Sequence, residues 1–412
     1  MGDDVRNKLS TALNQLDTWI EKEKFQGWDP YDALNSPILK TLSFENRLAG
    51  IIWVQLLKRL PVNLRSLLRV PKGYNPKGMG LFLSSYLRKF QMTGDKTHLE
   101  KVDFFSQWLR ENISPGYSGA CWGYNFDWPN RVFYAPAGVP TVVTTGFIGI
   151  FLLELARAAQ NHPELVQEDF TPAELACSAC DFVLLDLNRS SFAEDEICFS
   201  YTPMDTSKVH NANLLGGQLL AEVFQFGGQK DASLAENVLR CTRYSVRRQR
   251  SDGAWIYGED GNNAWVDNFH TGYVLLSLRK IGQCLETNEF NVSVEKGYKF
   301  WKYNFFLPDG IPKYYDTNTY PIDIHCVAQA ILTFIGFRDM DAEALSIAQH
   351  VANWGIEKMQ DPQGFFYFQR NRHYVNRIPY MRWAQAWMQQ ALIELSMAED
   401  MINYGRIENN LV

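Results

Sequence analysis

Six segments rich in small and apolar residues recur along the 412-residue chain, and this period constrains the fold more than any other feature. They begin near Lys77, Thr141, His210, Asp267, Ile322 and Tyr380. Successive starts lie roughly 55 to 70 residues apart, enough for one helix, a turn, a second helix and a return loop. The sequence therefore predicts six helical hairpins.

More polar, amphipathic helices are expected between these segments, over residues 42–60, 97–113, 171–187, 232–250, 292–305 and 341–358. Apolar helices fit the inside of a ring, where they are walled on all sides, and amphipathic helices fit the outside. Strand-like alternation is scarce. We predict an all-α fold, an (α/α)6 toroid formed by residues 1–412 as one domain, with residues 1–41 as a helical extension packed on the ring.

Charge and cysteine usage exclude several classes of function. The net charge is −6 and the basic residues are dispersed, so a nucleic-acid partner is not expected. The N-terminus lacks the pattern of a signal peptide, and we expect no transmembrane segment. Seven cysteines, an odd number with irregular spacing, indicate free thiols in the cytoplasm, with Cys177 and Cys180 as core residues. The oligomeric state is left open.

The loops before the apolar helices repeat a turn motif. Residues 248–255 read RQRSDGAW and residues 360–367 read QDPQGFFY, with weaker copies at 118–122 and 307–310. They resemble the Q-x-x-D-G-x-W repeat of squalene-hopene cyclases and prenyltransferase β-subunits, and sugar-active (α/α)6 enzymes use similar turns. Glycine permits the tight turn and the following aromatic residue fills a gap between hairpins. The repeat therefore specifies architecture more than chemistry.

A second resemblance lies at residues 267–273, DNFHTGY, which are similar to the D-x-Y-H-T-C-Y segment of protein prenyltransferase β-subunits. That likeness implies a zinc-binding role for His270. The sequence departs from both families, because it lacks the D-x-D-D acid of the class II cyclases and the Asp/Cys pair of the prenyltransferase zinc site.

The starts of the apolar helices should meet at one mouth of the ring, where free N–H groups and helix dipoles favour anions. Polar residues concentrate there: His210, Asn211, Asn213, Asp267, His270, Asp323, His325, Arg382 and Trp383. The loops that lead to the same mouth add Trp122, Tyr124, Asp127, Arg131, Tyr201, Trp255, Tyr257, Glu259, Arg370 and Arg372. This composition predicts a pocket for a polyhydroxylated anionic ligand, with aromatic rings for stacking and arginines for a carboxylate or phosphate.

Two chemistries fit such a pocket. Carboxylates that flank a glycosidic bond could hydrolyse it, and the candidates are Asp127, Glu259, Asp267 and Asp323. Alternatively, a histidine or tyrosine removes the proton beside a uronic-acid carboxylate, giving elimination or epimerisation, and the candidates are His210, His270, His325, Tyr201 and Tyr257. Asp267 and Asp323 have a simpler interpretation as helix caps.

We therefore expect a carbohydrate-active enzyme for a glycan or uronic-acid-containing saccharide, acting as hydrolase, lyase or epimerase without a cofactor. A catalytic zinc held by His210, His270 and His325 is a further hypothesis, because three protein ligands and an open position suffice. The alternatives are an isoprenoid enzyme of the cyclase or prenyltransferase type and a non-catalytic glycan-binding toroid.

Overall fold

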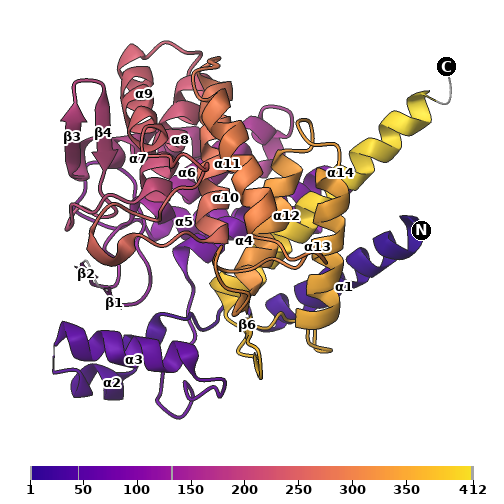
Figure 1. Cartoon of the computed structure of the whole chain (residues 1–412). Coiled ribbons are helices and arrows are strands. Elements are labelled where there is room, and N and C mark those ends of the chain that lie inside the picture. Colours follow the sequence, from indigo (N-terminus) through magenta and orange to yellow (C-terminus); the bar gives the residue numbers. More distant parts are fainter. Residues whose placement is uncertain (1, 45, 131–132, 410–412) are drawn as a thin grey trace.

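Six inner helices form a closed ring in the computed structural model, which describes residues 2–44, 46–130 and 133–409 (Figure 1). Each packs against the next, and the last packs against the first. They are α4 (Pro76–Thr93), α6 (Val142–Ala159), α8 (His210–Phe226), α10 (Asn268–Cys284), α12 (Ile324–Gly336) and α14 (Trp387–Asn409), the last preceded by one π-helical stretch, η5 (Met381–Ala386). The predicted inner helices are thus confirmed.

Each inner helix packs against one outer helix. The outer helices are α5 (Thr97–Glu111), α7 (Pro172–Asp181), α9 (Ala232–Val246), α11 (Asn291–Asn304), α13 (Ala344–Met359) and α1 (Gly2–Lys22). The sixth place belongs to α1, which packs against α13 and α14. The expectation that residues 42–60 form an outer helix is wrong, because α3 (Arg47–Arg59) packs beside the mouth of the ring instead.

The repeated turns show how the outer layer is held. The amide of Gln249 bonds the Gly253 carbonyl within its own turn and the Ser293 carbonyl of α11. The amide of Gln360 likewise bonds the carbonyls of Gly364 and Ala12, the latter in α1. The glutamine at the same position of both motifs therefore ties its turn to the next outer helix. For the turn of Gln360 that helix is α1.

The aromatic residues of these turns are buried wedges. The indole of Trp122 donates to the Leu109 carbonyl over 2.9 Å, and the indole of Trp255 donates to the Ser245 carbonyl over the same distance. Both side chains are almost fully buried. The prediction that they face the mouth as ligand platforms is corrected, since they fill gaps between hairpins.

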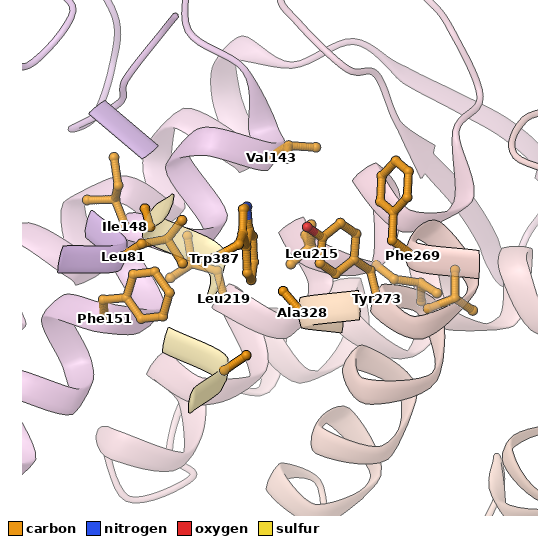
Figure 2. Packing of buried hydrophobic residues seen from close by; sticks show 14 of the residues in the cluster. Leu81, Val143, Ile148, Phe151, Leu215, Leu219, Phe269, Tyr273, Ala328 and Trp387 are labelled. Atoms are coloured by element: carbon orange, nitrogen blue, oxygen red, sulfur yellow. The ribbon is translucent and has the colours of Figure 1, made fainter. Parts of the chain in front are cut away.

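All six inner helices contribute to the buried centre of the ring. Figure 2 shows Trp387 and Tyr273 in this packing, and their ring centroids lie 5.6 Å apart. Leu81, Phe151, Leu215 and Ala328 come from the other four inner helices and are buried. This packing closes the ring below the mouth.

The mouth is surrounded by short strands and two short helices. The strands are β1 (Trp128–Pro129), β2 (Tyr134–Ala135), β3 (Arg189–Ala193), β4 (Glu196–Phe199), β5 (Ile322–Asp323), β6 (Gln369–Arg370) and β7 (Val375–Asn376), and all their pairings are antiparallel. The helices α2 (Pro37–Leu42) and α3 have a small core of their own with Leu39, Val54 and Leu57. We call residues 36–72 the mouth cap.

One helix in the described part of the chain, α6, is long and apolar enough to cross a membrane. It is an inner helix of the ring, and 72% of its apolar stretch is buried inside the protein. The length and composition of α6 are therefore explained by its place in the core.

Candidate active site

Two connected cavities open at the mouth of the ring. The outer cavity has a volume of about 350 Å³, and the inner cavity, of about 70 Å³, lies next to the inner helices. Both are lined by Tyr31, Trp128, Tyr201, Tyr257 and His270, so they are two parts of one pocket. The outer cavity lies within the roughly 300 to 1,000 Å³ typical of small-molecule sites.

The first turns of all six inner segments contribute to the inner cavity. The residues from these turns are Lys77, Val143, Asn211, Phe269, His270, His325, Arg382 and Trp383, and the second turn of α10 adds Tyr273. Caps hold several of these turns, for example Asn75, whose side chain accepts the Lys77 backbone N–H. The ring thus brings groups that are hundreds of residues apart into one pocket.

Lys77 is a buried lysine that has no carboxylate partner among the residues that the structure describes. Its ammonium lies 4.2 Å from the ring centroid of Phe147, 5.0 Å from that of Trp387 and 5.3 Å from that of Tyr273. Burial lowers the pKa of Lys77 well below its usual value, and the charge of Arg382 lowers it further. No hydrogen-bond acceptor within the described residues reaches Nζ, so a ligand in the inner cavity would be its natural partner.

Arg382 is held beside Lys77 by a bidentate ion pair. Its Nε and one terminal nitrogen donate to the two oxygens of Asp29, over 2.6 and 2.9 Å. Burial disfavours the charged form, but Asp29, together with Tyr124 and Tyr31, raises the pKa of Arg382 above its usual value. The second terminal nitrogen has no hydrogen bond to the described residues and is available to a ligand.

Asp267 and His270 form a dyad at the start of α10. The Asp267 side chain caps the helix by accepting the His270 N–H over 3.0 Å, and its other oxygen accepts from Nδ1 of the His270 ring over 2.7 Å. The indole of Trp265 donates to that same oxygen. Because the carboxylate fixes the proton on Nδ1, Nε2 of His270 is the free base, in a ring that lines both cavities.

Tyr273 and His325 form a second polar pair. Nδ1 of His325 donates to the Trp383 carbonyl over 3.1 Å, so Nε2 accepts the proton of the Tyr273 hydroxyl over 2.6 Å. Burial lowers the pKa of His325 well below its usual value, and the charge of Lys77 adds to this effect. Burial also raises the pKa of Tyr273. Both groups are therefore neutral near pH 7.

Aromatic side chains form the walls of the pocket. Tyr257 stacks on Trp265 with 4.7 Å between centroids and an angle of 11°. Trp128 packs edge-on against Tyr124 and Tyr201, with centroids 5.6 and 5.3 Å apart. Such flat faces suit the apolar faces of a sugar ring.

Asn211 adds an unsatisfied group to the inner cavity. The side chain is 2% exposed, and its amide oxygen is buried without a hydrogen-bond partner. A buried amide oxygen without a partner is costly, and a donor on a bound ligand would satisfy it.

Several predicted site residues lie in the pocket. Tyr124, Tyr201, Asn211, Tyr257, His270, His325, Arg382 and Trp383 line one or both cavities. Their places match the prediction, and their functional roles remain predictions. Arg131 lies outside the described residues.

His210, Asn213 and Glu259 do not line the pocket. His210 is the first residue of α8 and binds Glu259 through Nε2 over 2.9 Å and Ser245 through Nδ1 over 3.2 Å. Asn213 uses its amide for the Cys241 carbonyl and the Phe199 N–H. Their predicted places in the site are corrected: these side chains join α8 to its neighbours.

Asp323 and Asp127 line neither cavity, and both have structural partners. Asp323 caps α12 through the His325 N–H and accepts from the Trp383 indole and the Gln369 amide. Asp127 accepts from the Ala137 N–H and pairs with Lys40. Asp323 therefore positions His325 and Trp383, while Asp127, which precedes β1, joins the chain to Ala137 beyond β2.

The two predicted arginines of the last loop are absent from the pocket lining. Arg370 lies in β6, paired with Ile322 and Val375, and Arg372 is exposed. Lys58 and Arg59 of α3 contribute the positive charges of the outer cavity instead. The Lys58 ammonium donates to the Tyr31 hydroxyl over 2.7 Å.

The described residues contain no group of three or more His, Cys, Asp or Glu side chains arranged to hold a metal ion. Each of the three histidines of the hypothetical zinc site has its own partners, Glu259 for His210, Asp267 for His270 and Tyr273 for His325. The ring thus keeps the three imidazoles in separate pairs.

The pocket contains residues that the sequence analysis missed, above all Lys77, Tyr273 and Trp128. Lys77 carried a usable signal, since it is a lysine in the first turn of an otherwise apolar, small-residue segment. Trp128 had no such signal, because no sequence feature distinguishes it from Trp122, which is also a tryptophan but fills a gap between hairpins.

A closed ring of six inner and six outer helices with a pocket at the inner-helix starts defines the (α/α)6 toroid class, as predicted. Among solved structures of this fold, cellobiose 2-epimerase from Bacillus thermoamylovorans is 12% identical with a TM-score of 0.61, over 81% of this chain and 90% of that chain. The GH76 alpha-mannanase from Bacteroides thetaiotaomicron is 14% identical with a TM-score of 0.57, over 79% and 87%.

A protein from Listeria innocua is similar over nearly the whole length, 96% of this chain and 98% of that chain, with 13% identity and a TM-score of 0.60. At these identities the likeness establishes the fold. No protein-family profile matches the sequence, and no curated protein matches it significantly.

Proposed function

We propose that the protein is a carbohydrate-active enzyme that moves a proton on the carbon next to a carbonyl or carboxylate of a saccharide, as an epimerase, isomerase or lyase. One observation supports this proposal most: the Asp267–His270 dyad presents Nε2 to a pocket that also contains Lys77 and Arg382. A base beside fixed positive charges is the arrangement that removal of such a proton requires.

His270 is the proposed general base. Nε2 takes the proton from the sugar carbon, and the imidazolium that forms is stabilised by Asp267, which already holds Nδ1–H. The two bonds of Asp267 to the backbone and ring of His270 keep the imidazole in one orientation.

Lys77 and Arg382 are the proposed electrostatic partners. Removal of the proton leaves negative charge on the carbonyl or carboxylate oxygens of the substrate. A buried ammonium and a free guanidinium N–H stabilise that charge strongly because both side chains are almost fully buried, where the dielectric constant is low. The ion pair with Asp29 keeps the guanidinium in place throughout.

The Tyr273–His325 pair is the proposed second acid/base group. The Tyr273 hydroxyl can turn from Nε2 of His325 and return a proton to the substrate, and the Lys77 ammonium, 5.3 Å from the Tyr273 ring centroid, stabilises the tyrosinate that remains. Nε2 of His270 and the Tyr273 hydroxyl are thus two acid/base groups in one pocket, so a proton can leave the sugar to one group and return from the other, as epimerisation needs.

Hydrolysis by a pair of carboxylates fits less well. That mechanism requires two Asp or Glu side chains at the scissile bond. Neither cavity is lined by an Asp or Glu from the described residues. The structural neighbours include a cellobiose 2-epimerase, a D-mannose isomerase and a polysaccharide lyase, which supports proton transfer as the reaction class.

Solvent exchange tests this proposal directly. The protein is incubated in D2O with reducing disaccharides, free hexoses and uronic-acid oligosaccharides, and the products are examined by NMR. We expect deuterium at the carbon next to the carbonyl or carboxylate, in an epimer, a ketose or an unsaturated product. Cleavage of a glycosidic bond without exchange would contradict the proposal and favour a hydrolase.

A thermal-shift screen with the same saccharides and with prenyl diphosphates separates the remaining alternatives. Stabilisation by a saccharide without turnover or exchange indicates a binding toroid, and stabilisation by a prenyl diphosphate alone indicates an isoprenoid enzyme. A cytoplasmic location is part of the proposal, because all seven cysteines are free thiols and six of them are buried.

A further inference from the structure

The mouth cap exposes an unusual amount of apolar surface. Eight of the nineteen exposed large hydrophobic side chains in the described residues lie between residues 38 and 67. Phe44 is 83% exposed, Leu48 70% and Ile52 63%, and Leu56, Val62 and Leu67 are exposed as well. A concentration of exposed apolar side chains in one short segment indicates an interaction surface.

The patch lies on one face of each cap helix. In α3, Leu48, Ile52 and Leu56 are four residues apart and form one stripe. Gly50, Val54 and Leu57 face the small core of the cap. In α2, Ile38 and Leu42 are likewise four residues apart and exposed. Both helices therefore have one packed face and one unpartnered apolar face.

The charge of the mouth cap is opposite to that of the rest of the protein. Residues 36–72 contain seven Lys or Arg and one acidic residue, which gives +6, whereas the whole chain carries −6. Lys40, Arg47, Arg59, Arg69 and Lys72 are exposed. Lys40 pairs with Asp127 and Lys72 with Glu23, so Arg47 and Arg59, at the two ends of α3, are the exposed cations that flank the apolar stripe.

We infer that the mouth cap docks on an anionic lipid surface, with Leu48, Ile52 and Leu56 inserted among the headgroups. An amphipathic helix with aliphatic residues on one face and Lys or Arg at its flanks lies in the plane of a membrane interface. Each Lys or Arg near an anionic leaflet adds favourable electrostatic energy. The stripe of α3 is aliphatic, whereas the cores of protein interfaces are enriched in aromatic residues and Met.

Docking places the pocket at the membrane. Ile51, Gln55 and Lys58 of α3 line the outer cavity, and they lie on the helix face next to the Leu48–Ile52–Leu56 stripe. The open side of the pocket then lies beside the lipid headgroups, where a saccharide carried on a lipid is within reach. The docking itself stands independently of the reaction proposed above.

Vesicle sedimentation of the full-length protein tests the inference. We expect binding to vesicles of phosphatidylcholine and phosphatidylglycerol in equal parts, little binding to phosphatidylcholine alone, and weaker binding as salt is raised. The triple variant L48Q/I52Q/L56Q should bind the anionic vesicles at least about tenfold more weakly. Activity on a soluble saccharide should not change, because none of these three side chains lines the pocket.

A matched triple variant controls for the general loss of apolar surface. Leu185, Val292 and Met340 are 68%, 78% and 48% exposed and lie outside the mouth cap, so L185Q/V292Q/M340Q should bind vesicles like the wild type. The inference is overturned if the wild type does not bind anionic vesicles, or if both triple variants lose binding equally. A wild-type dimer that L48Q/I52Q/L56Q converts to a monomer, without vesicle binding, would assign the surface to a second copy of the chain instead.

Discussion

One carboxylate, that of Asp267, holds both the backbone and the ring of His270. Its first oxygen accepts the His270 N–H over 3.0 Å and its second accepts Nδ1–H over 2.7 Å. The ring centroid of Tyr257 lies 4.4 Å from that of the imidazole. The imidazole is therefore fixed in position and tautomer before any substrate binds, which is the usual condition for efficient general base catalysis.

His270→Gln should reduce kcat by at least about 100-fold with a small change in KM, because the substitution removes the proposed base and leaves the pocket walls intact. The measurement is steady-state kinetics on the saccharide that exchanges deuterium.

His210→Gln is the matched control, since His210 also begins an inner helix but lies outside both cavities. It should keep kcat within about threefold while lowering the free energy of unfolding by about 1 kcal/mol through the lost bond to Glu259. Equal losses of activity in both variants would remove His270 from its proposed role.

Lys77→Met should abolish at least about 99% of activity and raise the thermal midpoint, because it removes a catalytic charge and the energetic penalty of a buried lysine. The folded state depresses the pKa of Lys77 below the usual 10.5. Between those two pKa values the unfolded chain binds more protons, so wild-type stability rises with pH there. The advantage of the variant should therefore shrink as pH approaches 10.5, which differential scanning calorimetry across pH measures.

Lys302→Met provides the contrast, because Lys302 of α11 pairs with Asp341 and Glu343 away from the pocket. That variant should lose stability and retain activity. A lower thermal midpoint of Lys77→Met at pH 7 would mean that the Lys77 side chain stabilises the folded protein, which would contradict the expected energetic penalty of its burial.

His325 should make the protein sensitive to mild acid. Burial keeps its folded pKa well below 6.5, so below pH 6.5 the unfolded chain takes up a proton that the folded protein does not. Unfolding is then favoured as pH falls, by up to about 1.4 kcal/mol per pH unit. Urea titrations of the wild type and His325→Gln between pH 7 and pH 5 should show a steeper loss in the wild type, and parallel curves would contradict the assignment.

The ring was predictable because its signal repeats six times, but the place of α1 was not. Both α1 and α3 are amphipathic, and the period of the sequence does not say which of them completes the outer layer. Long-range contacts, such as that of Gln360 with Ala12, 348 residues apart, determine which helix completes the outer layer. Local sequence patterns contain no record of such a contact.

The site was predictable only in part, because helix phase decides which residue of a first turn reaches the pocket. His210 is the first residue of α8 and points to Ser245, while its neighbour Asn211 lines the inner cavity. His325 is the second residue of α12 and His270 is the third residue of α10, and both line the inner cavity. A change of one residue along a helix rotates the side chain by about 100°. A helix boundary is uncertain by about one or two residues, so the sequence does not decide which side chain of the first turn faces the pocket.

The closure of the ring by α1 can be tested at one glycine. Gly364 has a φ of +105°, and a Cβ there would lie 2.2 Å from the Gln15 carbonyl oxygen of α1. Gly364→Ala should therefore lower the free energy of unfolding by about 3 kcal/mol or more, since the strain of the left-handed backbone adds to a clash with a backbone atom that cannot move alone.

Gly116→Ala is the control, because Gly116 has a φ of +86° with nothing within 4 Å of its Cβ position. It should cost only about 1 to 2 kcal/mol. Chemical denaturation measures both, and hydrogen exchange should show faster opening of α1 in Gly364→Ala alone. Equal costs for the two substitutions would mean that α1 contributes little to closing the ring.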